Sequence, residues 1–116
     1  MAVAMKNVVV FVMDLQKARR FYLELLKLPL KGETPSMMEF FTGQPTLGVV
    51  LAMHDDARKL VGRHTGITLA VTGIDRVCAD LTLAGVSFPE PLEATPWGKM
   101  AVLQDPDGNQ FALVEG

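Results

Sequence analysis

The sequence predicts an α+β fold made of two βαβββ units, which together form a concave mixed sheet with helices on its outer face. One observation is a repeated pattern: an apolar, β-branched run, a turn and an amphipathic stretch occur at 7–28 and again at 66–86. A second is that the two copies superpose, with Asp14–Leu15 on Gly73–Ile74. A third is that strand-like runs follow each copy. A fixed repeat indicates one supersecondary unit built twice.

The length and composition favour one globular domain. The chain has 116 residues, of which 49% are hydrophobic and 21% charged. We expect a single domain over 1–116, with units at about 5–53 and 65–115. Half of the chain would bury too little apolar surface to be stable alone, so the units should share a core or pair with a second copy of the chain. A net charge of −2 argues against a nucleic-acid partner.

The single cysteine and the N-terminal residues bear on location. One cysteine, Cys78, excludes an internal disulfide, and its place on a helical apolar stripe favours a small buried side chain over a reactive thiol. The apolar run at 8–13 stops at Asp14, so it is too short to span a membrane or to serve as a signal peptide. We therefore expect a cytoplasmic protein with no membrane partner.

The first unit has clear boundaries in the sequence. Residues 7–13 predict a strand, Asp14 is a suitable helix N-cap, and Pro29 should end the helix that follows. The helix buries an apolar stripe of Ala18, Phe21, Tyr22, Leu25 and Leu26. Strands are expected at 36–42 and 46–53, joined by a turn at 43–45.

The second unit repeats this order. Its predicted elements are a strand at 66–71, a helix at 74–84 closed by Gly85, a short strand at 86–88 broken by Pro89 and Pro91, and strands at 99–104 and 110–115. Asp105-Pro106-Asp107-Gly108-Asn109 between the last two strands is typical of a tight turn. The polar stretch 54–64 divides the units.

Two segments carry a resemblance to a known family. MDLQKARRFYLELLKLPL, at 13–30, and TPWGKMAVLQDPDGNQFALVE, at 95–115, resemble the opening unit and the closing hairpin of the vicinal oxygen chelate superfamily. This glyoxalase, bleomycin resistance protein and extradiol dioxygenase family contains both enzymes and proteins that only bind, so the resemblance implies the fold and leaves the function open.

The resemblance also implies four positions for a metal ion on the concave face. Metal-dependent members supply two ligands from each unit, typically His, Glu or Gln, one at the start of the first strand and one on the last. The corresponding positions here are Asn7, the segment 48–51 with Val49 and Leu51 as the nearest candidates, Gly66 and Ala112. Only Asn7 has a side-chain donor atom, so we expect no metal and no other cofactor. One divalent ion is the alternative.

Two histidines bear on that alternative. His64 lies two residues before Gly66, so a register shift of two would place it on the same face of the strand. His54 precedes Asp55 and Asp56, but neighbouring side chains on an extended chain point apart. For both histidines a loop position is favoured over a metal ligand.

Strand alternation assigns side chains to the concave face. The expected ligand-binding residues are Asn7, Val9, Phe11, Phe40, Val49, Leu51, Thr68, Trp97, Met100, Gln110 and Ala112. Many are small or apolar, which favours an apolar or aromatic ligand, with Asn7, Thr68 and Gln110 as polar contacts. Trp97 is expected either to stack on a planar ligand or to cover the core.

Two carboxylates, Glu39 and Glu115, lie close enough to the expected cavity to be candidate acid–base groups. Glu39 and Glu115 both alternate away from the neighbour assigned to the cavity, so both are expected to point off the concave face. The predicted function is metal-free binding or sequestration of a small, largely apolar or aromatic molecule by a homodimer. The alternatives are a metal-dependent lyase, isomerase or dioxygenase of the glyoxalase type, and a structural or regulatory dimer module with a vestigial cavity.

Overall fold

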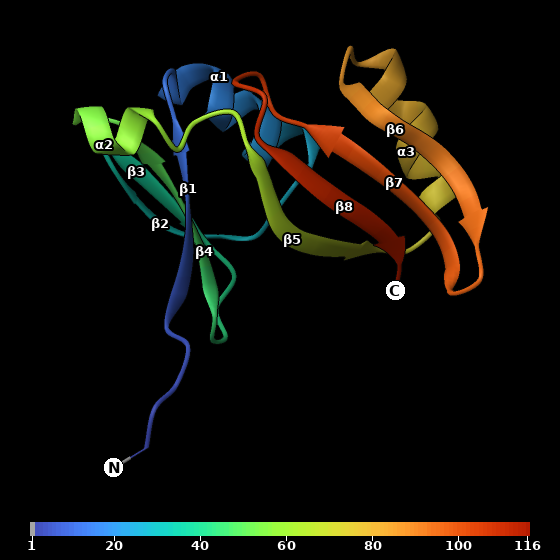
Figure 1. The fold of residues 1–116 in the computed structure, drawn as a ribbon, viewed down its shortest axis with the longest axis horizontal. Coiled ribbons are helices and arrows are strands. Elements are labelled where there is room, and N and C mark those ends of the chain that lie inside the picture. Colours follow the sequence, from blue (N-terminus) through green and yellow to red (C-terminus); the bar gives the residue numbers. More distant parts are fainter. Residues whose placement is uncertain (1) are drawn as a thin grey trace. The chain divides into compact units, whose positions relative to one another are not determined.

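The computed structural model describes residues 2–116, which form two compact units divided between Val61 and Gly62 (Figure 1). Each unit contains a four-stranded mixed sheet and one long helical segment. The predicted α+β class and the predicted repeat are therefore confirmed. That the units share one core stays a prediction.

The sheet of the first unit has the order β1-β4-β3-β2. β1 and β4 pair in parallel, whereas β3 is antiparallel to both β4 and β2. The strands are β1 (Asn7–Val12), β2 (Leu30–Thr34), β3 (Met37–Phe40) and β4 (Thr46–Leu51), and a four-residue helix, α2 (Asp55–Arg58), follows them. β2 was not predicted, because all five of its side chains are exposed and give no alternating pattern.

The long helical segment of the first unit covers one face of this sheet. It begins as α1 (Leu15–Arg19) and continues as a π-helical stretch, η1 (Arg20–Leu25). The predicted cap is confirmed: the Asp14 side chain accepts a hydrogen bond from the Lys17 amide at 3.1 Å. Tyr22 is fully buried, and its ring centroid lies 6.2 Å from that of Phe40 on β3. This aromatic contact fixes which face of the sheet is the core face.

The helix of the first unit ends before Pro29. Lys27 adopts φ 56°, in the left-handed region, and the next amide, of Leu28, donates to the Tyr22 carbonyl at 3.1 Å. This is the usual geometry of a helix C-terminus, here built on a lysine where glycine is commoner. The backbone conformation at Lys27 therefore ends the helix, and Pro29 lies just beyond this end.

The second unit repeats the first. Its sheet has the order β5-β8-β7-β6, with β5 and β8 parallel and the other pairs antiparallel. The elements are β5 (His64–Val71), α3 (Ile74–Leu83), β6 (Ser87–Thr95), β7 (Gly98–Gln104) and β8 (Gln110–Glu115). Ile74, Cys78 and Leu81 of α3 are buried, as the apolar stripe predicts.

The predicted end of β6 is wrong. The strand runs through Pro89 and Pro91 to Thr95 instead of stopping at residue 88. Two reasons make the prolines compatible with a strand: β6 is an edge strand, and its register against β7 shifts between Ser87 and Glu90 and again between Glu90 and Glu93. Proline is tolerated at sheet edges and at bulges, where its missing N–H is not needed.

The predicted tight turn between β7 and β8 is confirmed, and it is held by a buried polar network. The Asp105 carboxylate accepts hydrogen bonds from the amides of Asp107 and Asn109 at 2.9 and 2.8 Å, and from the Asn109 side chain at 2.9 Å. The Asn109 side-chain oxygen accepts from the Gly62 amide at 2.9 Å. Both side chains are at most 3% exposed, so the turn and the start of the unit form one hydrogen-bonded structure.

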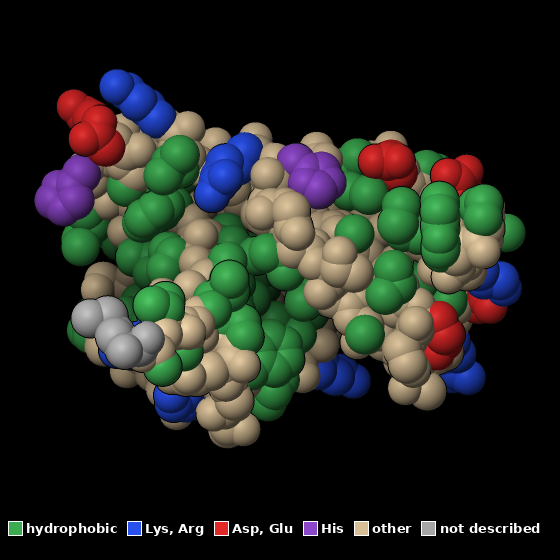
Figure 2. Space-filling model, turned by 60° about the horizontal axis from the view of Figure 1, so that its bottom comes forward, with side chains coloured by type: hydrophobic (Ala, Val, Ile, Leu, Met, Phe, Trp, Pro, Cys, Tyr) green, Lys and Arg blue, Asp and Glu red, His purple; other side chains and the backbone are tan. Residues whose placement is uncertain are grey.

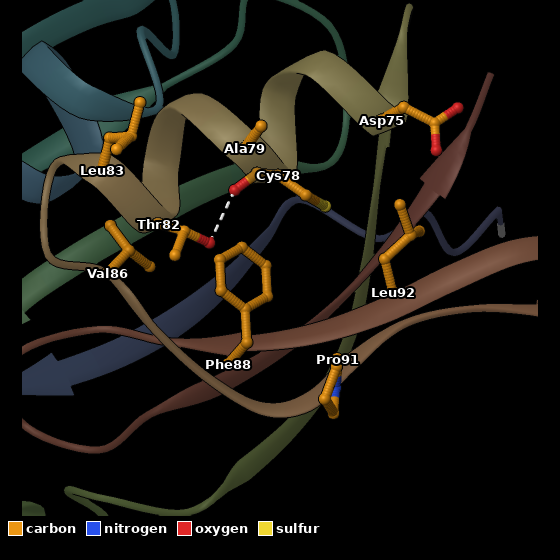
Figure 3. A pocket seen from close by; sticks show the side chains of 9 residues that line it. All are labelled: Asp75, Cys78, Ala79, Thr82, Leu83, Val86, Phe88, Pro91 and Leu92. Carbon is orange, nitrogen blue, oxygen red and sulfur yellow. Dashed lines mark hydrogen bonds between the residues drawn. The ribbon is translucent and has the colours of Figure 1, made fainter.

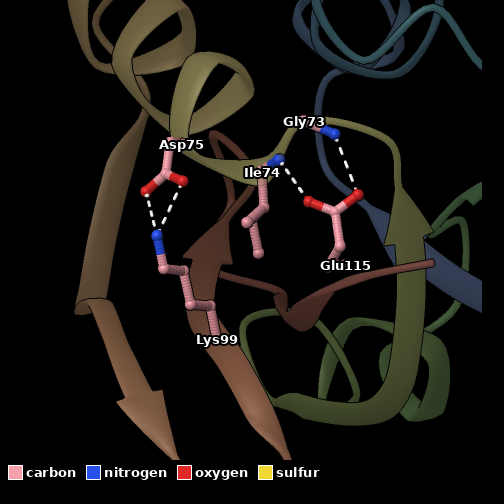
Figure 4. A network of polar contacts seen from close by, with 5 residues as sticks. All are labelled: Gly73, Ile74, Asp75, Lys99 and Glu115. Atoms are coloured by element: carbon pink, nitrogen blue, oxygen red, sulfur yellow. Dashed lines mark hydrogen bonds and ion pairs between the residues drawn. The ribbon is translucent and has the colours of Figure 1, made fainter.

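The start of α3 is capped from the far end of the unit. Gly73 occupies the position that Asp14 holds in the first unit but has no side chain to cap the helix. Instead the Glu115 carboxylate accepts hydrogen bonds from the amides of Gly73 and Ile74, both at 2.9 Å (Figure 4). These two bonds lower the pKa of Glu115 from its ordinary value of 4.5. The last residue of β8 thus ties the sheet to its helix, and the expectation that Glu115 points away from the concave face is confirmed.

This cap predicts a pH-dependent stability. Because the folded-state pKa of Glu115 is lowered, its contribution to stability is present above pH 4.5 and is lost as the pH falls through the folded pKa. Glu115→Gln should lower the urea midpoint at pH 7 and make it fall less steeply between pH 5 and pH 3. Glu93→Gln, an exposed glutamate of β6, is the charge-matched control. A Glu115→Gln protein with the same pH slope as wild type would contradict the assignment.

Candidate functional site

Each sheet has one face under its helical segment and one face turned away from it, which we call the distal face. In the first unit the helix side carries Val10, Val12, Met38, Phe40, Leu47 and Val49, all at most 5% exposed. Residues paired side by side in a sheet point to the same side, so the strand register assigns the remaining residues. The distal face of unit 1 consists of Asn7, Val9, Phe11, Met37, Glu39, Thr46, Gly48 and Val50.

The register contradicts the expected orientation of Phe40, Val49 and Leu51. Phe40 pairs with Leu47, Val49 with Val10, and Leu51 with Val12, all on the helix side. Phe40 and Val49 are 0% exposed. The assignment was wrong because the four-residue strand β3 has apolar residues, Met37, Met38 and Phe40, on both of its faces. Alternation of apolar and polar residues therefore could not show which face is buried.

The same register brings Glu39 onto the distal face of unit 1, where sequence reasoning did not place it. Glu39 pairs directly with Gly48, which pairs in turn with Val9. The Thr46 hydroxyl, 3% exposed, donates to the Glu39 carboxylate at 2.6 Å. The expectation that Glu39 points away from this face is therefore wrong. One feature of the sequence could have indicated this position: Glu39 is the one polar residue in an otherwise apolar strand.

The distal face of unit 2 carries the residues that the sequence assigned to it. Thr68 pairs with Ala112, Ala70 with Val114, and Val114 with Met100. By this register the set is His64, Thr68, Ala70, Met100, Val102, Gln104, Gln110, Ala112 and Val114, with His64 at the end of the face next to Gln110. Thr68 and Ala70 are exposed and most of the others half-buried. This face is lined by small and apolar side chains, with Thr68, two glutamines and, at its end, His64 as its polar groups.

Trp97 lies in the connection between β6 and β7, and its side chain is 93% exposed. The expectation that it covers the core is therefore wrong, whereas a stacking role stays a prediction. Large hydrophobic side chains reach the surface elsewhere in both units (Figure 2).

The four positions implied for a metal do not provide a ligand set. Gly66 and Ala112 have no side-chain donor, and the distal residues on β4 are Thr46, Gly48 and Val50. Among residues 2–116 no group of three or more His, Cys, Asp or Glu side chains is arranged to hold a metal ion. As a set, these four positions lack the donor atoms that a divalent ion needs.

Both histidines are exposed, but the expectation of a loop position is wrong for His64, which belongs to a strand. His64 begins β5, where its Nδ1 atom accepts a hydrogen bond from the Gly66 amide at 3.1 Å. A register shift between His64 and Thr68 keeps His64 paired with Gln110. His54 precedes α2, with no capping bond from its side chain.

A separate apolar groove of about 690 Å³ lies between α3 and β6, on the helix side of the second sheet (Figure 3). Its lining consists of Asp75, Cys78, Ala79, Thr82, Leu83, Val86, Phe88, Pro91 and Leu92. Burial raises the pKa of the Cys78 thiol, and the nearby Asp75 carboxylate raises it further. Asp75 itself pairs with Lys99 at 2.7 Å (Figure 4).

Comparison with known proteins identifies the family of this chain. The family model described as Glyoxalase/Bleomycin resistance protein/Dioxygenase superfamily matches residues 4–113. The chain belongs to this superfamily. A member of it from Sphaerobacter thermophilus DSM 20745 is 31% identical, with a TM-score of 0.80 over 99% of this chain and 98% of that one. No match is found among curated proteins.

Two other solved structures of the superfamily differ in what they are described to do. TnmS3, an antibiotic binding protein from Streptomyces sp. CB03234, is 29% identical, with a TM-score of 0.78 over 99% of this chain and 98% of that one. Lactoylglutathione lyase from Agrobacterium tumefaciens is 19% identical, with a TM-score of 0.71 over 99% and 95%, and shows the fold alone. No helix within residues 2–116 is long and apolar enough to cross a membrane.

The raised pKa of Cys78 predicts slow alkylation. The pH–rate profile for iodoacetamide should show an apparent pKa above the ordinary 9.0, because the thiolate is disfavoured by burial and by Asp75. Asp75→Asn should move the profile to lower pH and raise the rate at a given pH, without removing the larger effect of burial. Asp80→Asn, on the same helix, is the control. A profile at or below 9.0, or one that Asp75→Asn leaves unchanged, would contradict this account.

Proposed function

We propose that the protein binds a small, largely apolar or aromatic molecule at the distal faces of its sheets and holds it without chemical change. The observation that carries this proposal is the chemistry of those faces. They combine small and apolar side chains with a few polar groups, which is the usual composition of a small-molecule binding surface. The 29% identity to a protein described as antibiotic-binding supports it.

The metal-binding positions support binding over metal-dependent catalysis. Three of the four, the segment 48–51, Gly66 and Ala112, have no side-chain donor atom. They therefore cannot hold an ion that would also bind substrate oxygens. We propose further that the protein acts as a cytoplasmic homodimer, as the sequence predicts.

One observation favours the alternative, a metal-dependent enzyme of the glyoxalase type. Glu39 and Asn7 both lie on the distal face of unit 1, which therefore has a carboxylate and an amide oxygen. Divalent ions prefer such oxygen ligands. The alternative needs these two groups to replace the missing ligands.

A bulky side chain on the distal face of unit 2 should block binding. Thr68→Trp should weaken the binding of 1-naphthalenemethanol, an aromatic probe, by at least about tenfold, because the indole occupies space over Ala112. Arg76→Trp, which adds the same indole on the exposed side of α3, should leave affinity unchanged. Fluorescence titration measures both, and circular dichroism checks folding. Unchanged affinity in a folded Thr68→Trp protein would contradict binding of the probe at the distal face of unit 2.

Metal content separates the two functions. Untagged protein incubated with nickel, zinc, manganese or iron(II) and then dialysed should retain close to no metal by mass spectrometry, since its donor set is incomplete. About one ion per chain, lost in Glu39→Gln, would overturn the proposal in favour of the metal-dependent enzyme.

A further inference from the structure

A half-buried carboxylate lies among apolar side chains on the distal face of unit 1. The Glu39 Oε2 atom accepts a hydrogen bond from the Thr46 hydroxyl at 2.6 Å. Among residues 2–116, no lysine, arginine or histidine pairs with it, and no protein donor contacts its other oxygen, Oε1. A carboxylate in such a position lacks part of its hydration and is therefore a strong acceptor for a ligand's N–H or O–H group.

The residue opposite this carboxylate has no side chain that could donate a hydrogen bond to it. Glu39 pairs across the β3–β4 ladder with Gly48. A Cβ atom built on Gly48 would lie 3.5 Å from the Val9 Cγ2 atom and 3.8 Å from the Val50 Cγ2 atom. The two valines therefore pack closely over this glycine, so the neighbours of the carboxylate on β4 and β1 are apolar and offer it no second side-chain donor.

We propose that Glu39, held in place by Thr46, selects ligands that carry a hydrogen-bond donor, a hydroxyl or an amine, next to an apolar aromatic body. This inference rests on the proposed binding function and names the ligand chemistry of one of the two faces, the distal face of unit 1. Glu39 is the specificity-determining residue because its free oxygen meets the donor. Thr46 is a positioning residue because its hydroxyl fixes the orientation of the carboxylate.

Three fluorescent probes with one ring system test this selectivity. 1-Naphthylmethylamine and 1-naphthalenemethanol carry a donor, whereas 1-methylnaphthalene has the same ring without one. Wild-type protein should bind the two donor probes about tenfold more tightly than 1-methylnaphthalene, as expected for one hydrogen bond to a charged acceptor. Glu39→Gln should reduce this preference to below about twofold, because a neutral amide is a weaker acceptor than a carboxylate, and circular dichroism checks that the variant is folded.

The chain supplies matched controls. Glu33→Gln makes the same change on β2, where Glu33 pairs with Met38 and ion-pairs with Arg19 on the helix side of the sheet, and it should leave the preference intact. Thr46→Val removes the hydroxyl that orients Glu39 and should lower the preference, and Thr46→Ser should restore it. Rescue by serine is not expected if Thr46 only fills space.

The outcomes separate this inference from the function on which it rests. If the three probes bind with equal affinity, or Glu39→Gln keeps the preference, the role of Glu39 is wrong while aromatic binding stands. If none of the probes binds, the proposed function fails, and the role of Glu39 with it. If the amine binds tightly and the alcohol only as well as 1-methylnaphthalene, the site selects for positive charge, and donor recognition as proposed is overturned.

Discussion

The pairing of β4 between β1 and β3 is the constraint on which the candidate site depends. Gly48 lies between Val9 on one side and Glu39 on the other. A shift of one residue would turn every side chain of a strand to the other face, placing Glu39 under the helix and Phe40 outside. The contact of Phe40 with Tyr22 in the core opposes such a shift. Core packing therefore decides where the carboxylate lies.

The second unit holds the same topology by different interactions. A distant carboxylate, Glu115, replaces the local cap Asp14, and the Asp105–Asn109 network closes the hairpin. Both lie away from the distal face of that unit, at element ends. Because these polar groups are satisfied by the protein itself, the distal face keeps its small and apolar side chains available for a ligand.

The sequence was sufficient for the repeat, the fold class and the distal face of unit 2, because β5 and β8 alternate clearly between large and small side chains. It was insufficient where periodicity was absent. β2 is exposed throughout, and β3 is short and apolar on both faces. In β6 the two prolines led to a predicted strand end, whereas the edge strand continues through them. Glu39 was misplaced for the same reason as Phe40, since the two are neighbours in β3.

The most direct test is to map a bound probe onto the protein by methyl and amide NMR during titration with 1-naphthalenemethanol. The account predicts that the largest shift changes occur at distal-face residues, at Val9 and Val50 for binding to unit 1 or at Ala70 and Ala112 for binding to unit 2. Changes confined to Ala79, Leu83 and Val86 would place the probe in the groove between α3 and β6 and contradict the account.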